Sequence, residues 1–295
     1  MLSDSTKQRL RDPGYLELHM VAAALSKDLQ RVPWYDAHFL KRFAVAKTYL
    51  GMVAPQLLPQ FADGFAPLQT AAGFAPVKLD DVLDPQEFAD TVALANEIPR
   101  AKLETHELGA FGRHVVHDHP AFTQLQARLQ PRVEAVLGRP LVAGYNFLSL
   151  YNGAGKCDPH LDEPFSMFTL DLCLEQNVDW PIWFSRIIDW SQAEDLLAIP
   201  PAQLSQRADL AFAPHLLQPN QALLFSGSAQ WHYRDAIPAG GFCNLLFLHY
   251  YPAGAELLVR PHRWAEHFGF AELEPLCDLF AEVLVEGDFP EPADR

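Results

Sequence analysis

The sequence predicts a mainly β protein that also contains helices, with a sandwich or barrel at its core. The second half holds several short aromatic and aliphatic segments bounded by glycine, proline, asparagine or aspartate. Such a series is typical of strands in a sandwich or barrel rather than of alternating strands and helices. The first third instead carries apolar residues at helical spacing. We therefore expect a helical N-terminal region (1–76) and a β-rich region with buttressing helices (77–295), or one continuous domain.

Local signals place the helices. Pro55 falls late in an apolar, helix-like stretch, so that helix is expected to be long or broken. Asp84 suits an N-cap and Pro85 the first helical position, while Gly138 suits a C-cap. A loop rich in glycine and proline (61–76) is the expected joint between the two regions. The expected helices cover residues 15–31, 35–58, 84–94, 121–137 and 271–285.

The strands are expected where β-branched, aromatic and aliphatic residues run for about five to nine positions between turn residues. A polar, proline-containing insertion (191–220) interrupts this series and is expected to form a helix and a loop. The expected strands cover residues 144–151, 167–174, 181–188, 222–226 and 243–251.

Composition excludes several classes of protein. The 295 residues include 22 Lys and Arg against 37 Asp and Glu, a net charge of −15. An acidic surface repels phosphates, so we expect neither nucleic acid nor an anionic membrane as a partner. The beginning of the chain lacks the apolar stretch of a signal peptide, and no apolar run is long enough to span a bilayer. The four widely spaced cysteines indicate reduced thiols and a cytoplasmic location.

A candidate metal site begins just after the first expected strand. His160 and Asp162 are two residues apart, so in an extended segment their side chains point to the same side. His232 follows another expected strand and is the third candidate. Two imidazoles and one carboxylate leave three positions of an octahedron open, the arrangement used by non-heme Fe(II) oxygenases. A His-x-Asp pair or a single histidine also occurs in purely structural roles, so the order of the surrounding motifs carries weight.

Those motifs resemble a known family. The His-x-Asp pair follows Y-x-G-x-G, the second histidine follows P-N-x-A-L-L-F-S-G, and I-P-x-G-G precedes the last apolar strand. With the D-P-Q-E-F-A-D and L-Q-x-R-x-E-A-V-L-G helices, the stretch 84–255 resembles the 2-oxoglutarate/Fe(II)-dependent dioxygenase superfamily, in particular its prolyl-4-hydroxylase-like branch. The resemblance implies a double-stranded β-helix, or jelly roll, with the helical N-terminal region packed against it.

The resemblance also implies a chemistry. His160, Asp162 and His232 would bind Fe(II), and Tyr151 matches a family tyrosine that contacts the co-substrate. Fe(II), 2-oxoglutarate and O2 would together hydroxylate an unactivated C–H bond, with release of succinate and CO2. The substrate would be a small metabolite, an amino acid or a peptidyl group. Trp231 and Tyr233 alternate with the second histidine and are expected to face away from the metal.

The chain departs from the family at one position. A basic residue usually follows the second histidine by about ten positions and pairs with the distal carboxylate of 2-oxoglutarate, but residues 240–244 contain none. Arg234 is the first candidate to replace it, because it shares a strand face with the second histidine. Arg186 is the second candidate and His249 the third. Two alternatives follow: an Fe(II) oxygenase that does not use 2-oxoglutarate, or a non-catalytic metal-binding jelly-roll protein.

A second cluster of histidines lies at residues 113–119, between Gly112 and Pro120. His117 and His119, or His114 and His117, could chelate a metal ion, but no third ligand has suitable spacing. We expect an ordinary surface loop or edge strand near the mouth of the barrel. Contact with the substrate is the alternative role.

Overall fold

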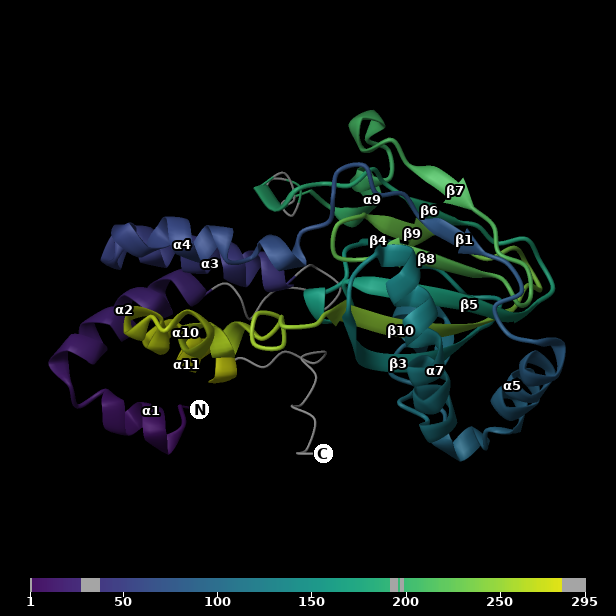
Figure 1. Ribbon diagram of the computed structural model, residues 1–295, viewed down its shortest axis with the longest axis horizontal. Coiled ribbons are helices and arrows are strands. Elements are labelled where there is room, and N and C mark those ends of the chain that lie inside the picture. Colours follow the sequence, from purple (N-terminus) through teal and green to yellow (C-terminus); the bar gives the residue numbers. More distant parts are fainter. Residues whose placement is uncertain (1, 28–37, 192–195, 197–198, 283–295) are drawn as a thin grey trace. The chain divides into compact units, whose positions relative to one another are not determined.

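The computed structural model describes residues 2–27, 38–191, 196 and 199–282 (Figure 1). Contacts divide the chain into two compact units, Met1–Gln69 with Gly254–Arg295 and Thr70–Ala253. The division expected from the sequence kept the C-terminal segment with the barrel, whereas the contacts group it with the N-terminal helices. No helix in the described part of the chain is both long and apolar enough to cross a membrane.

The first unit is a group of helices from both ends of the chain, built around aromatic side chains. Phe39, Phe61 and Phe65 each pack edge-on against Trp264, with ring centroids 5.1–5.6 Å apart. A 3-10 turn that begins at Pro55 separates two of the helices, as the broken-helix alternative predicted. The helices are α1 (Asp4–Arg9), α2 (Pro13–Ser26), α3 (His38–Val53), α4 (Leu58–Asp63), α10 (Trp264–Phe268) and α11 (Glu274–Glu282). The last residues of the helices expected over 15–31 and 271–285 lie outside the described residues.

Two helices of the second unit carry the terminal signals that the sequence indicated, the N-cap at Asp84 and the C-cap at Gly138. The Asp84 carboxylate accepts hydrogen bonds from the first free backbone N–H groups of α5. Gly138 ends α7 with a φ of 65°, which is a left-handed conformation that suits glycine. The described helices of this unit are α5 (Pro85–Glu97), α6 (Leu108–Phe111), α7 (Pro120–Leu137) and α9 (Pro201–Leu204).

Two antiparallel sheets form the core of the second unit. The larger has the order β1-β8-β5-β10-β3-β2 and the smaller the order β4-β9-β6-β7. From β3 to β10 the chain passes back and forth between the two sheets, which is the connectivity of a jelly roll. The larger sheet contains β1 (Val77–Leu79), β2 (Arg113–His117), β3 (Leu141–Tyr151), β5 (Phe168–Gln176), β8 (Ala222–Ser226) and β10 (Cys243–Pro252). The smaller contains β4 (Cys157–His160), β6 (Ile182–Phe184), β7 (Ala213–His215) and β9 (His232–Arg234). The predicted fold class is confirmed.

Two strand expectations need correction. The strand expected over residues 181–188 ends at Phe184. Beyond it the backbone N–H groups of Ser185 and Arg186 donate to the carbonyls of Trp231 and Leu210, which lie outside the strands. The insertion expected as helix and loop also contains strand β7, which pairs with β6. Its sequence, Ala-Pro-His, has too little β-forming character to mark it as a strand.

Candidate metal centre

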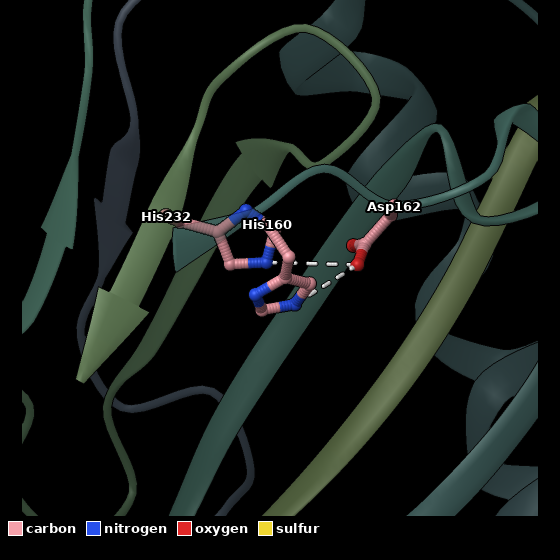
Figure 2. Close-up of side chains that lie close together, drawn as sticks. All are labelled: His160, Asp162 and His232. Carbon is pink, nitrogen blue, oxygen red and sulfur yellow. Dashed lines mark ion pairs between the residues drawn. The ribbon is translucent and has the colours of Figure 1, made fainter. Parts of the chain in front are cut away.

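The smaller sheet brings the three candidate ligands together (Figure 2). His160 on β4 and His232 on β9 are directly opposed partners in antiparallel register, as the adjacent-strand prediction required. Asp162 lies two residues beyond the end of β4. Its Oδ1 is 3.5 Å from Nε2 of His160 and 3.6 Å from Nε2 of His232. The three ligand atoms all lie within 4.8 Å of one another, close enough to hold one metal ion.

Backbone carbonyls fix the orientation of both imidazole rings. Nδ1 of His160 is 2.9 Å from the carbonyl oxygen of Asp158, and Nδ1 of His232 is 3.0 Å from that of Gln230. A carbonyl oxygen only accepts, so each Nδ1 carries the proton and donates it. In its neutral form, each ring therefore keeps an electron pair on Nε2, the nitrogen that faces Asp162. Metal-binding histidines are held in their ligating tautomer in this way.

The position of the Asp162 carboxylate depends on the absence of a side chain at Gly227. The backbone N–H of Asp162 donates to the Gly227 carbonyl at 2.9 Å. A Cβ added at Gly227 would lie 2.0 Å from Oδ2 of Asp162, well inside van der Waals contact. The Thr169 hydroxyl donates to the same Oδ2 at 3.5 Å. Oδ1 is thereby left directed at the two imidazoles.

Aromatic side chains enclose the second histidine. The ring of His232 packs against Phe184 and Phe225, at centroid distances of 5.7 and 5.1 Å. Tyr233 instead stacks parallel on Trp183 at 5.9 Å, away from these rings. Because side chains alternate along β9, the His232 ring packs among apolar aromatic rings. This packing already restricts its rotamers, so the ring loses little freedom when it binds a ligand.

The electrostatics of the three groups suit a cation. Burial alone would raise the pKa of Asp162, but His232 and His160 hold it well below its usual range. Burial and the neighbouring His160 lower the pKa of His232 to about 4. Burial also disfavours the charged form of His160, yet Cys157 and Asp162 outweigh it and raise its pKa. The site therefore stabilises one positive charge beside the carboxylate, and a metal ion would replace that proton.

Arg234, the first candidate for a co-substrate carboxylate, forms a buried ion pair. Its Nη2 donates to Oδ2 of Asp171 at 2.8 Å and its Nη1 to the Trp180 carbonyl at 2.7 Å. The guanidinium also lies over the Trp180 ring. Oδ1 of Asp171 has no hydrogen-bond partner among the described residues. Burial raises the pKa of Asp171 despite the opposing charge of Arg234. Asp171 was not among the residues predicted from the sequence, although an acidic residue within the apolar strand FTLDLCL signals a buried charge.

Tyr151 also contacts a buried arginine. Its hydroxyl accepts a hydrogen bond from Nη1 of Arg113 at 2.7 Å, and Arg113 forms a second contact with the Glu107 carboxylate. Arg113 lies on β2, an edge strand of the larger sheet. An edge strand was one of the two structures expected for residues 113–119. The side chain nevertheless points inward and is buried. The sequence did not predict that Arg113 contacts Tyr151 or that Glu107 contacts Arg113, because an edge strand was expected to lie at the surface.

The other two co-substrate candidates differ in environment. Arg186 has an exposed side chain that donates to the carbonyls of Asp209 and Ile187, outside the barrel interior, because its strand ends early. His249 on β10 is only 3% exposed. Its Nδ1 is 2.9 Å from the Thr169 hydroxyl, and its Nε2 is buried with no partner among the described residues.

Comparison with known proteins gives structural likeness alone. No family model and no curated protein matches the chain. The non-heme alpha-ketoglutarate-dependent epimerase SnoN from nogalamycin biosynthesis is 16% identical with a TM-score of 0.46, covering 68% of this chain and 82% of that one. HygX from Streptomyces hygroscopicus, solved with nickel and 2-oxoglutarate, is 11% identical with a TM-score of 0.48, covering 66% and 87%. A Pseudomonas putida prolyl-4-hydroxylase is 15% identical with a TM-score of 0.44, covering 64% and 98%.

Proposed function

We propose that the chain is a non-heme Fe(II) and 2-oxoglutarate-dependent dioxygenase that hydroxylates an unactivated C–H bond. One observation carries the proposal: two imidazoles in the Nδ1–H tautomer direct their Nε2 atoms at one carboxylate oxygen inside a jelly roll. Two neutral nitrogens and one oxygen on one side of an ion fit Fe(II) and leave positions for further ligands. The motif order along the sequence agrees with this family.

The residues have separable roles in this proposal. His160, Asp162 and His232 hold the iron, and Asp158 and Gln230 orient the two rings through their carbonyl oxygens. When bound, iron and 2-oxoglutarate would supply oxidation of the substrate by O2, with succinate and CO2 as by-products. The protein's part is to position the substrate and to exclude water with the aromatic side chains that surround His232.

Arg234 is the proposed partner of the distal carboxylate of 2-oxoglutarate. It projects from the same strand as the second histidine, with the alternation that puts both on one face. Its side chain is buried, so a charge-assisted hydrogen bond there is shielded from water. Tyr151, held by Arg113, is the proposed neutral contact beside it.

The proposed substrate is a small metabolite, an amino acid or a peptidyl group. A net charge of −15 favours a cationic or zwitterionic molecule over a polyanion. The four cysteines are free and buried, which agrees with the proposed cytoplasmic location.

An anaerobic titration tests the iron site and the co-substrate together. Fe(II) and then 2-oxoglutarate are added to the purified protein while the visible spectrum is recorded. We expect a metal-to-ligand charge-transfer band, because the keto acid would chelate the iron. His160→Ala should lose the band and His106→Ala, which changes an exposed histidine, should keep it. Iron bound at full occupancy without a band would overturn the use of 2-oxoglutarate.

Arg234→Lys tests the distal contact. This variant keeps a positive charge for Asp171 but loses the planar fork of the guanidinium. We expect the Kd of 2-oxoglutarate to rise about tenfold, the value of one charge-assisted contact, while iron stoichiometry is unchanged. An unchanged Kd would show that the distal carboxylate does not need the planar fork of Arg234.

A second function is favoured by the Arg234–Asp171 ion pair. The acid already neutralises the cation, so a further carboxylate would approach a pair with no net charge. This arrangement fits an Fe(II) oxygenase that needs no 2-oxoglutarate. Substrate-dependent oxygen consumption that is equal with and without the keto acid would establish it. Tight metal binding with no oxygen consumption across substrates would instead indicate a non-catalytic metal-binding protein.

A further inference from the structure

The position of His249 is set by the local backbone and by hydrogen bonds from several other groups. It lies at a β-bulge in β10, where the register with β3 shifts between Leu248 and Tyr250. Bulges of this kind re-aim a side chain and are common beside active sites. The Gln126 side chain donates to the freed carbonyl of His249 at 2.7 Å. The imidazole is therefore held in the barrel interior by its own backbone.

A hydrogen-bonded chain links this imidazole to the proposed metal ligand. Nδ1 of His249 is 2.9 Å from the Thr169 hydroxyl oxygen, and that hydroxyl donates to Oδ2 of Asp162 at 3.5 Å. Thr169 and His249 are cross-strand partners on β5 and β10, so the contact is built into the sheet register.

The direction of this chain follows from the chemistry of its members. An ionised carboxylate only accepts hydrogen bonds, so Thr169 gives its single hydroxyl proton to Asp162. The Thr169 oxygen must then accept from His249, which places the His249 proton on Nδ1. Burial of the ring lowers the pKa of His249 to about 4, so a second proton is disfavoured. Nε2 is left with an electron pair that is buried and without a donor among the described residues.

We infer that His249 is a ligand-binding residue whose Nε2 accepts a hydrogen bond from a hydroxyl or amine group of the organic molecule bound beside the metal. The inference rests on the proposed function, because it takes Asp162 as an ionised metal ligand. It excludes His249 as the partner of a carboxylate, which offers no proton to an unprotonated nitrogen. His249 thereby sets specificity for a substrate that carries an O–H or N–H donor.

The surroundings of the ring limit what that molecule is. His249 packs on Tyr145 with ring centroids 4.2 Å apart, and Phe147 and Phe247 lie at 5.6 and 6.4 Å. These side chains offer flat, largely apolar surface around a single acceptor nitrogen. The arrangement fits a donor group carried on an apolar or ring-shaped frame.

Nitrogen NMR of the full chain tests the inference without turnover. Protein labelled with 15N-histidine is loaded with Zn(II), a diamagnetic stand-in for Fe(II), and the His249 signals are assigned by comparison with His249→Phe. We expect Nδ1 to be protonated and Nε2 unprotonated. In Thr169→Val, which removes the hydroxyl and keeps the shape, the proton should shift toward Nε2. Thr48→Val, an exposed change in α3, should leave the His249 signals unaltered.

Binding of 2-oxoglutarate to the Fe(II) protein provides the second measurement. We expect His249→Phe to change the Kd of 2-oxoglutarate less than about threefold, whereas loss of a carboxylate partner would raise it about tenfold. Either that tenfold loss or a protonated Nε2 in the fully loaded wild-type protein would overturn the inference. Failure of the triad to bind Zn(II) or Fe(II) at all is a separate result, which would instead overturn the proposed function.

Discussion

Two groups of side chains in the barrel unit combine two histidines with a carboxylate. In one, His160 and His232 flank Asp162. In the other, Glu104 accepts from Nδ1 of His117 at 2.9 Å, and Nδ1 of His106 lies 3.7 Å from the same oxygen. Both groups contain the residue types of a metal site. They differ in which ring nitrogen meets the carboxylate and in what holds the other.

That difference separates the proposed ligand set from a surface ion pair. In the triad, backbone carbonyls accept hydrogen bonds from both Nδ1–H groups, so both Nε2 atoms are directed at the same carboxylate oxygen. In the Glu104 group, the carboxylate itself accepts hydrogen bonds from Nδ1 of His117 and from the backbone N–H of the same residue. Its histidine side chains are 27% and 60% exposed, against 16% and 6% in the triad. Orientation and burial, rather than composition, distinguish the two.

Paired histidine substitutions should give the largest contrast between the groups. His160→Ala removes one of the three proposed ligands, and we expect Fe(II) affinity to fall by more than the 10–100-fold typical of an outer-shell change. His117→Ala should leave iron stoichiometry unaltered, because its ring proton is committed to Glu104. Anaerobic calorimetry with metal analysis measures both. Equal losses in the two variants would erase the distinction drawn between the groups.

Gly227→Ala should affect the triad through the carboxylate alone. The added methyl group would meet Oδ2 of Asp162 at 2.0 Å, so the carboxylate must move. We expect about tenfold weaker metal binding, together with a loss of roughly 1–3 kcal/mol in unfolding free energy from overpacking. Gly153→Ala is the matched control, since nothing lies within 4 Å of its added Cβ. If Gly227→Ala binds metal like the wild type, Asp162 does not need its observed position.

Glu104→Gln should produce the smallest effect, confined to the second group. Burial acts to raise the pKa of Glu104, but hydrogen bonds from His117 outweigh it and lower the pKa. A depressed carboxyl pKa stabilises the fold above the unfolded-state pKa, and this contribution disappears as pH falls through the folded-state value. We expect a loss below about 1 kcal/mol at pH 7, because the group is partly exposed.

Urea denaturation at neutral and acidic pH measures this difference. Wild type and Glu104→Gln should converge in stability at a pH below the folded-state pKa of Glu104. A constant difference across the whole pH range would mean that the carboxylate charge does not contribute. Iron binding should be the same in both proteins, since Glu104 belongs to the second group.

Local chemistry determined much of the fold from the sequence. Strand β8 covers the residues 222–226 that the sequence predicted, and α5 begins at its aspartate cap and proline. Period-two alternation, a property of the backbone, identified the pair His160 and Asp162. His232 was identified by its place after a predicted strand and by the motif order of the family that the sequence resembles. These features depend on residues close together in the chain, so a linear reading could find them.

Only the tertiary structure decided which buried charges meet. Arg234 lies 63 residues from Asp171, and Arg113 lies 38 residues from Tyr151. The link from His249 through Thr169 spans 80 residues. Pairings at such separations depend on sheet register and on the exchange of strands between two sheets, neither of which alternation specifies. The sequence therefore determined the elements and the candidate metal ligands, while strand pairing decided the partners and the available nitrogen of His249.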